Sequence, residues 1–307
     1  MSMLRHPVEM PAPVTHRRAY LLLAGVILLW GVNWPVMKVG LQYMPPLWFA
    51  AARVLLGGAC LFALVAARGR LRIPERQDLP ILISVGVLQI ALFIGLIHIS
   101  LQYVDAGRSA ILAYTTPLWI TPLAVVLLHE PITMGRLAGL GLGLVGIGVL
   151  FNPATFDYSQ TPALIGNGLL LLAALGWAVG IIHVRLHRWV MTSLELLPWQ
   201  MLIGGILLTA LAAWTEDDLA VRWSGTLVAI IAYNGLAASA FCYWAFVTVT
   251  RSLPATSTAM GALGVPVAGV LFSALLLAEP LSATIIVGLG LITAGVALVV
   301  IGDVRES

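Results

Sequence analysis

Three stretches of this chain, residues 79–104, 158–184 and 223–250, each run for more than 25 residues without an Asp, Glu, Lys or Arg. A helix that crosses a bilayer needs about 20 predominantly apolar residues, so each stretch is long enough to span one. Only 9% of all residues are charged, against about 25% in a typical soluble protein. So few charges cannot cover a water-soluble surface, and the chain is predicted to be an all-α integral membrane protein.

Similar apolar stretches follow one another along the 307 residues. Because unpaired backbone groups are costly in lipid, each stretch is expected to form a helix that satisfies its own N–H and C=O groups. Dividing the chain at charges, Pro/Gly turns and polar clusters predicts ten transmembrane helices. Their expected ranges are 19–41, 46–67, 79–102, 107–128, 134–151, 164–185, 194–214, 226–248, 254–277 and 280–301.

The Lys and Arg side chains are distributed unevenly between the two sets of connecting segments. With the N-terminus in the cytoplasm, about 12 of the 16 lie inside, 3 lie outside and 1, Arg53, lies within a span. Positive charges in short loops are retained on the cytoplasmic side, so we expect cytoplasmic tails over residues 1–18 and 302–307. Because the charges are spread over short loops, the net charge of +3 does not indicate a nucleic-acid partner.

The same residue types recur in the two halves of the chain at a nearly constant offset. Trp30, Gly57 and Gly58 recur 147 positions later at Trp177, Gly204 and Gly205, whereas Ala106, Pro117, Glu130-Pro131 and Gly139-Leu140-Gly141-Leu142 recur 149 positions later at Ala255, Pro266, Glu279-Pro280 and Gly288-Leu289-Gly290-Leu291. A repeat of five helices enters the membrane the second time from the opposite side. We therefore expect a first repeat over 19–151, an external linker over 152–163 and an inverted second repeat over 164–301.

Inverted repeats are a recurring architecture of secondary transporters, because two like units that rock against each other expose one site to each side in turn. The alternative is a duplicated membrane module that transports nothing.

Several of these motifs resemble the drug/metabolite transporter superfamily, and within it the EamA family. They are Trp30-Gly31-Val32-Asn33-Trp34-Pro35, Ala106-Gly107-Arg108, Tyr114 to Trp119, Leu253-Pro254-Ala255 and Leu277-Ala278-Glu279-Pro280-Leu281. The resemblance covers about residues 19–301 and is closest to YddG-type exporters of aromatic amino acids. It implies a carrier of the cell inner (plasma) membrane that exports amino acids by alternating access. Another small amphipathic metabolite or drug is the alternative cargo, and a membrane enzyme or an inert scaffold is less favoured.

Arg53 is predicted to lie at membrane depth, roughly 10 Å below the outer end of its helix at 1.5 Å per residue. Ionisable groups at that depth usually face a water-filled path or a partner. One interpretation is that its planar guanidinium receives a substrate carboxylate. The other is that it snorkels, or bonds to backbone carbonyls and tightens the first repeat.

Neutral polar and aromatic side chains also fall within the predicted spans. Each amide or phenol could bond to a neighbouring helix, and each Trp could belong to an interfacial belt. The equivalent pair Trp30 and Trp177 lies near mid-span, which fits an aromatic-lined cavity better than a belt. The predicted substrate-binding residues are Trp30, Asn33, Arg53, Gln89, Tyr114, Trp177, Gln200, Tyr233, Asn234 and Tyr243.

Pro117 and Pro266 occupy equivalent positions near mid-membrane, where a proline removes a backbone donor and kinks a helix. We interpret both as gating residues. The Gly-rich fifth and tenth spans are expected to pack closely against other helices.

The remaining expectations concern absences. The acidic residues nearest the membrane, Asp105, Glu130, Glu195 and Glu279, fall at predicted helix ends, so we expect gradient-driven movement without tight proton coupling. No Walker-type motif indicates ATP as the energy source. Cys60 and Cys242 lack metal-site spacing, and we expect no metal, no cofactor and no catalysis. The expected partners are a small-molecule substrate and the lipid bilayer, and the pattern is compatible with a monomer.

Overall fold

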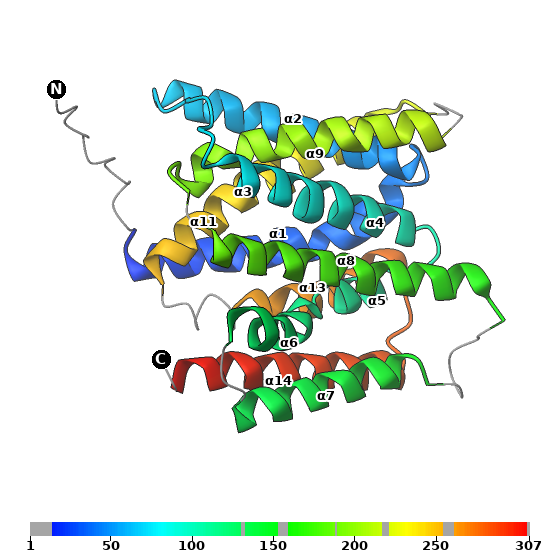
Figure 1. Cartoon of the computed structure of the whole chain (residues 1–307). Coiled ribbons are helices and arrows are strands. Elements are labelled where there is room, and N and C mark those ends of the chain that lie inside the picture. Colours follow the sequence, from blue (N-terminus) through cyan, green and yellow to red (C-terminus); the bar gives the residue numbers. More distant parts are fainter. Residues whose placement is uncertain are drawn as a thin grey trace.

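The computed structural model describes residues 14–129, 133–152, 159–187, 189–216, 221–253 and 261–305, which form helices and their connections without any strand (Figure 1). The first half contains α1 (His16–Gly40), α2 (Pro46–Ala67), α3 (Leu79–Ser84), η1 (Val85–Leu92), α4 (Phe93–Ser100), α5 (Ala106–Ala113), α6 (Thr116–Leu128) and α7 (Met134–Leu150). The second half contains α8 (Thr161–Leu186), α9 (Ser193–Thr215), α10 (Gly225–Ala232), η2 (Tyr233–Phe241), α11 (Cys242–Ser252), α13 (Gly264–Leu277) and α14 (Ala283–Arg305).

Seven of the described helical stretches are long and apolar enough to cross a membrane: His16–Gly40, Pro46–Ala67, Leu79–Ser100, Ala106–Leu128, Thr161–Leu186, Ser193–Thr215 and Gly225–Phe246. Three shorter apolar helices cover Met134–Leu150, Gly264–Leu277 and Ala283–Val299. This confirms an all-helical, multi-pass membrane protein over the described ranges. Residues 1–13, residues 306–307 and residues 153–158 of the predicted linker lie outside them.

The bounds of α2 are those expected from hydropathy, whereas α1 begins at His16 rather than at residue 19. The stretch expected as one helix over 107–128 is broken at Tyr114 and Thr115, between α5 and α6. Pro117 lies in the first turn of α6, where a helix does not need the missing N–H. In the second half, α13 likewise begins just after a turn at Leu263, with Pro266 in its first turn.

Side chains tie the interhelical connections together at each end of the helix bundle. At the first end, Glu216 accepts hydrogen bonds from the Leu47 and Trp48 amides at 2.8 and 3.1 Å. Lys38 Nζ donates to the Leu101 and Val104 carbonyls at 2.5 and 2.8 Å. We name this the Lys38 end. It gathers the connections 41–45, 101–105 and 278–282, together with Glu216 and residues 221–224.

At the opposite end, buried Asp78 accepts hydrogen bonds from the Val190 and Met191 amides at 2.8 and 3.2 Å. Arg70 Nε pairs with Glu195 Oε1 at 3.1 Å. We name this the Asp78 end, and the described end of the N-terminal segment also lies there, since the Val14 amide donates to Ser252 Oγ. Consecutive spans therefore run in alternating directions between the two ends.

Close backbone packing between the halves occurs at glycines. The Gly-rich helices α7 and α14 lie side by side (Figure 1), and a Cβ at Gly139 would stand only 2.5 Å from the Gly295 carbonyl oxygen. A Cβ at Gly57 on α2 would stand 3.0 Å from the Gly235 oxygen on η2, and one at Gly204 on α9 would stand 3.0 Å from the Gly86 oxygen on η1. Small residues allow such approaches, which helix association in lipid depends on.

Candidate functional site

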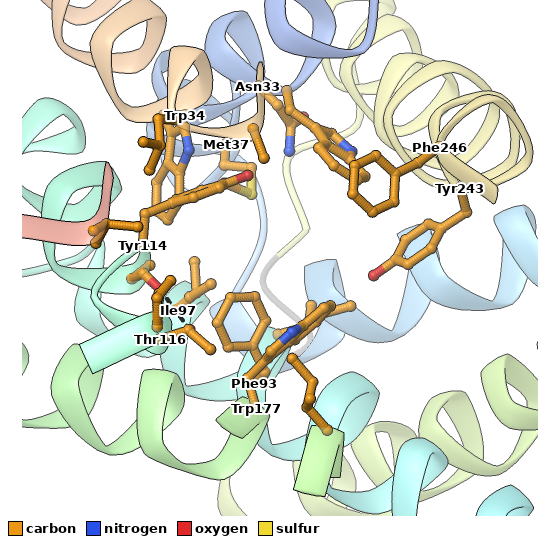
Figure 2. Close-up of a pocket in the computed structure, with 18 of the residues that line it drawn as sticks. Asn33, Trp34, Met37, Phe93, Ile97, Tyr114, Thr116, Trp177, Tyr243 and Phe246 are labelled. Carbon is orange, nitrogen blue, oxygen red and sulfur yellow. Dashed lines mark hydrogen bonds between the residues drawn. The ribbon is translucent and has the colours of Figure 1, made fainter. Parts of the chain in front are cut away.

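A cavity of about 350 Å³ lies between helices of the two halves (Figure 2). That volume is within the usual range for small-molecule sites, about 300–1,000 Å³. Its walls come from α1, α2, α4, α5, α6, α8, α11 and α14, together with the α5–α6 break and the residues just before α13. The lining residues are Trp30, Asn33, Trp34, Met37, Arg53, Phe93, Ile94, Ile97, His98, Ala113, Tyr114, Thr116, Pro117, Ile120, Trp177, Ile181, Tyr243, Phe246, Ala262, Leu263 and Val296.

Two aromatic groups face each other across this cavity. On one wall the Trp30 ring meets Tyr243 edge-on, with centroids 5.8 Å apart, and lies 5.4 Å from Phe246. On another wall Phe93 and Trp177 have centroids 4.5 Å apart. Figure 2 shows these walls around an open centre into which the Tyr243 hydroxyl points. Aromatic faces and edges at such spacings form a well-defined apolar surface for another ring.

Arg53 lines the same cavity from α2 and is only 7% exposed. Its Nη1 contacts Met37 Sδ at 2.9 Å, and its Nη2 donates to Ser239 Oγ at 3.4 Å. Nε is buried without a hydrogen-bond partner. No Asp or Glu is among the described residues that line the cavity, so this guanidinium has only neutral neighbours there.

Two acceptors in the cavity wall also lack partners. Asn33 Oδ1 is buried and unbonded, and so is His98 Nε2. The other imidazole nitrogen, Nδ1, contacts the Ile94 carbonyl at 2.7 Å, which assigns the ring proton to Nδ1 and leaves Nε2 as an acceptor. The cavity therefore combines a cationic donor with neutral acceptors inside an apolar shell.

A second cavity of about 200 Å³ adjoins the first. Gln89 and Gln200 line it, and Trp177 and Tyr243 belong to the walls of both cavities. Gln89 Nε2 donates to the Trp177 carbonyl at 3.4 Å. These two rings thus lie between the larger cavity and a smaller one lined by two glutamines.

The predicted site residues divide into three groups by position. Those in the larger cavity are Trp30, Asn33, Arg53, Tyr114, Pro117, Trp177 and Tyr243, and those in the smaller one include Gln89 and Gln200. Tyr233 donates instead to the Leu29 carbonyl at 2.6 Å, and buried Asn234 donates to the Ile230 carbonyl at 3.0 Å. Pro266 is buried in α13 and is not among the described residues that line either cavity. The roles of all these residues stay predictions.

Sequence reasoning missed several lining residues, among them Trp34, Met37, Phe93, Thr116 and Phe246. Trp34 and Met37 lie one and two helical turns beyond Trp30, so helical spacing could have found them. Phe93 and Phe246 carry no such signal, because an apolar side chain in a membrane span is equally suited to lipid.

Comparison with known proteins places this arrangement in a family. The sequence pattern of the EamA-like transporter family matches residues 17–152 and again residues 164–301. The uncharacterized transporter YvbV of Bacillus subtilis (strain 168) is 30% identical over 283 residues, which are 92% of this chain and 91% of that protein.

Two relatives with more informative names are a probable amino-acid metabolite efflux pump of Salmonella typhimurium (strain LT2), 27% identical, and one of Escherichia coli (strain K12), 26% identical; each match covers 90% of this chain and 93% of the relative. A solved crystal structure superposes with a TM-score of 0.66 at 20% identity, over 95% of this chain and 100% of that one, a likeness of fold alone. The family pattern covers both halves, and the chain belongs to the EamA-like transporter family of membrane transporters.

Proposed function

We propose that this transporter exports amino acids with aromatic or large apolar side chains across the cell inner membrane by alternating access. The observation that carries the proposal is the aromatic cavity between the two halves, which holds Arg53 and unpartnered neutral acceptors. Aromatic walls favour an apolar side chain, while the polar groups suit the charged ends of an amino acid. The two relatives named as probable amino-acid metabolite efflux pumps support the same cargo class.

Another amphipathic metabolite or drug is the second candidate. It is favoured by the apolar character of most of the cavity wall, which selects by size and shape rather than by an amino group. A flux assay with purified protein in liposomes separates the two. We expect labelled phenylalanine to cross faster than alanine, without chemical conversion. Transport of an apolar drug with no transport of any amino acid would refute the proposed cargo.

The architecture in this proposal is ten transmembrane helices in two inverted repeats, with both termini in the cytoplasm. Support comes from the family pattern, which matches the chain twice. It also comes from reciprocal packing between the halves. Helix α2 of the first half packs on η2 of the second, and α9 of the second half packs on η1 of the first. The positive-inside distribution assigns the Asp78 end to the cytoplasm.

Cysteine labelling tests this topology in a background without Cys60 and Cys242. Ser159→Cys is predicted to react with an impermeant reagent from outside, and Gln77→Cys only from inside. Both side chains are exposed, which makes them suitable reporters. The opposite pattern of labelling would reverse the proposed orientation while leaving the helix arrangement intact.

A further inference from the structure

Arg53 is the only formally charged residue among the described residues that line the larger cavity. A guanidinium stays protonated in proteins, and a buried charge is costly unless a partner neutralises it. Among the described residues, the hydrogen-bond partners of Arg53 are Met37 Sδ and Ser239 Oγ, which are both neutral. The cavity therefore carries a positive charge that the described residues leave uncompensated.

We propose that Arg53 binds the carboxylate of the cargo, and that the site selects amphipathic monocarboxylates whether or not they carry an amino group. This inference rests on the proposed transport function, because it assigns the chemistry of the same cavity.

The unpaired N–H donor of Arg53 suits a carboxylate. Guanidinium N–H groups form a planar fork that matches two carboxylate oxygens, and Nε is the donor that has no partner. The adjacent Nη2 bond to Ser239 is long, at 3.4 Å. Because Nε is buried, a carboxylate would form a bidentate pair at the Nε edge after the neighbouring side chains shift and the long Ser239 bond is displaced.

The amino group is dispensable on electrostatic grounds. In an amino acid, the ammonium and carboxylate share one carbon, so the ammonium would stand close to the same guanidinium and repel it. The lining side chains that have acceptor atoms without a partner, Asn33 and His98, are neutral, and those atoms, Oδ1 and Nε2, are buried. These neutral side chains can accept a hydrogen bond from an ammonium, but they do not attract it as a carboxylate would in an ion pair. A simple carboxylate instead leaves the occupied cavity electrically neutral.

The aromatic walls define the rest of the cargo. The rings of Phe93, Trp177 and Phe246 surround the centre of the cavity (Figure 2), and Trp30 also lines it. Burial of apolar surface between them favours a ring or a branched chain attached to the carboxylate.

The wild-type protein tests the inference with four small probes of matched size: 3-phenylpropionate, phenylalanine, 3-phenylpropanamide and 2-phenylethylamine. Binding is measured by tryptophan fluorescence at neutral pH, where the carboxylates are ionised. We expect 3-phenylpropionate to bind at least as tightly as phenylalanine. We expect the amide and the amine to bind at least tenfold more weakly, which corresponds to about 1.4 kcal/mol.

An amide that binds within tenfold of the acid, phenylalanine that binds more tightly than 3-phenylpropionate, or no binding by either acid would overturn the inference. Flux in liposomes keeps the two proposals distinguishable. Acids that bind with this preference but never cross would refute transport and support the Arg53 assignment.

Two variants locate the effect at Arg53. Arg53→Met removes the charge and keeps much of the length, and it should abolish the difference between acid and amide. Arg53→Lys keeps a positive charge and should retain part of the difference in affinity between acid and amide. Size-exclusion profiles control for folding. A folded Arg53→Met protein with wild-type discrimination would overturn the inference, and if this variant does not fold, the wild-type panel decides.

Discussion

Glu279 caps the N-terminus of α5, where its Oε2 accepts a hydrogen bond from the Gly107 amide at 2.9 Å. Its other oxygen, Oε1, accepts from the Ala106 amide at 2.7 Å. Asp105 occupies the N-cap position but makes no capping bond with its side chain. A carboxylate from far along the chain therefore satisfies the first amides of α5. Together with Lys38, it closes the Lys38 end around the connection 101–105.

Burial raises the pKa of the Glu279 carboxyl; the two amide hydrogen bonds and Lys38 oppose this shift, and Asp105 adds to it. A carboxyl whose pKa is raised by folding contributes stability that is complete below its unfolded-state pKa and is lost as the pH rises through its folded-state pKa. We therefore expect the Tm of the wild type, relative to Glu279→Gln, to fall as the pH rises from about 4, the unfolded-state pKa of a Glu carboxyl, through its raised folded-state pKa.

Thermal unfolding in detergent across that range measures the difference, and Glu75→Gln serves as the control at an exposed carboxyl. A Tm difference that stays constant or rises with pH would contradict the role assigned to Glu279.

The aromatic walls predict a selective effect on cargo. Trp177→Ala removes the ring that lies 4.5 Å from Phe93, and Trp30→Ala removes the ring beside Tyr243 and Phe246. Because an aromatic contact adds only about 0.5–1.5 kcal/mol beyond area burial, we expect each variant to lower phenylalanine flux roughly 2- to 10-fold relative to alanine flux.

The comparison is made at equal surface expression. Trp30→Phe is a matched variant, since it keeps a ring but loses the bond from Nε1 to the Ala238 carbonyl. An unchanged ratio of the two fluxes in both alanine variants would exclude an aromatic-selective cavity.

The contact between α7 and α14 predicts a difference between two glycines two residues apart. A Cβ at Gly139 would stand 2.5 Å from the Gly295 oxygen, whereas one at Gly141 would have nothing within 4 Å. Gly139→Ala should therefore cost about 1–3 kcal/mol through overpacking. Gly141→Ala should be neutral, or stabilising by up to about 1 kcal/mol through helix propensity. Thermal unfolding of both variants checks this, and equal Tm values would show that the close approach carries no energetic weight.

Asp78 predicts a stability effect at the other end of the bundle. Its Oδ1 serves the Val190 and Met191 amides, and its Oδ2 accepts from the Glu75 amide at 3.1 Å. Asp78→Ala leaves these donors without their acceptor and should cost about 1–3 kcal/mol. Asp78→Asn retains one acceptor oxygen and should cost less. The prediction fails if the alanine variant unfolds at the wild-type temperature.

The charge content of the cavity wall predicts transport without proton coupling, because no carboxylate is among its described residues. A pH gradient imposed on liposomes, with no solute gradient and no membrane potential, should therefore drive no uphill flux. The measurement follows internal cargo over time, and accumulation against its gradient would establish coupling. A titration of Glu279 would then be the first candidate mechanism, testable in Glu279→Gln.

The amino-acid sequence by itself determined that the protein lies in a lipid bilayer, that it is all-helical, and to which family it belongs. Hydropathy alone predicted a helix over 46–67, which the structure contains as α2. The EamA resemblance read from motifs such as Trp30 to Pro35 is confirmed by the family pattern. Arg53 was evident from sequence because a charge at membrane depth is rare enough to stand out against an apolar background.

Only the tertiary structure decided which side chains meet. Phe93, Trp177 and Phe246 come from three separate helices and share one cavity, whereas Gln89 and Gln200 lie in a second one and Tyr233 bonds to the Leu29 carbonyl. The physical reason is that lipid and protein interior are both apolar. A membrane helix therefore lacks the polar face that would reveal its orientation, and only packing against its neighbours selects the inward residues.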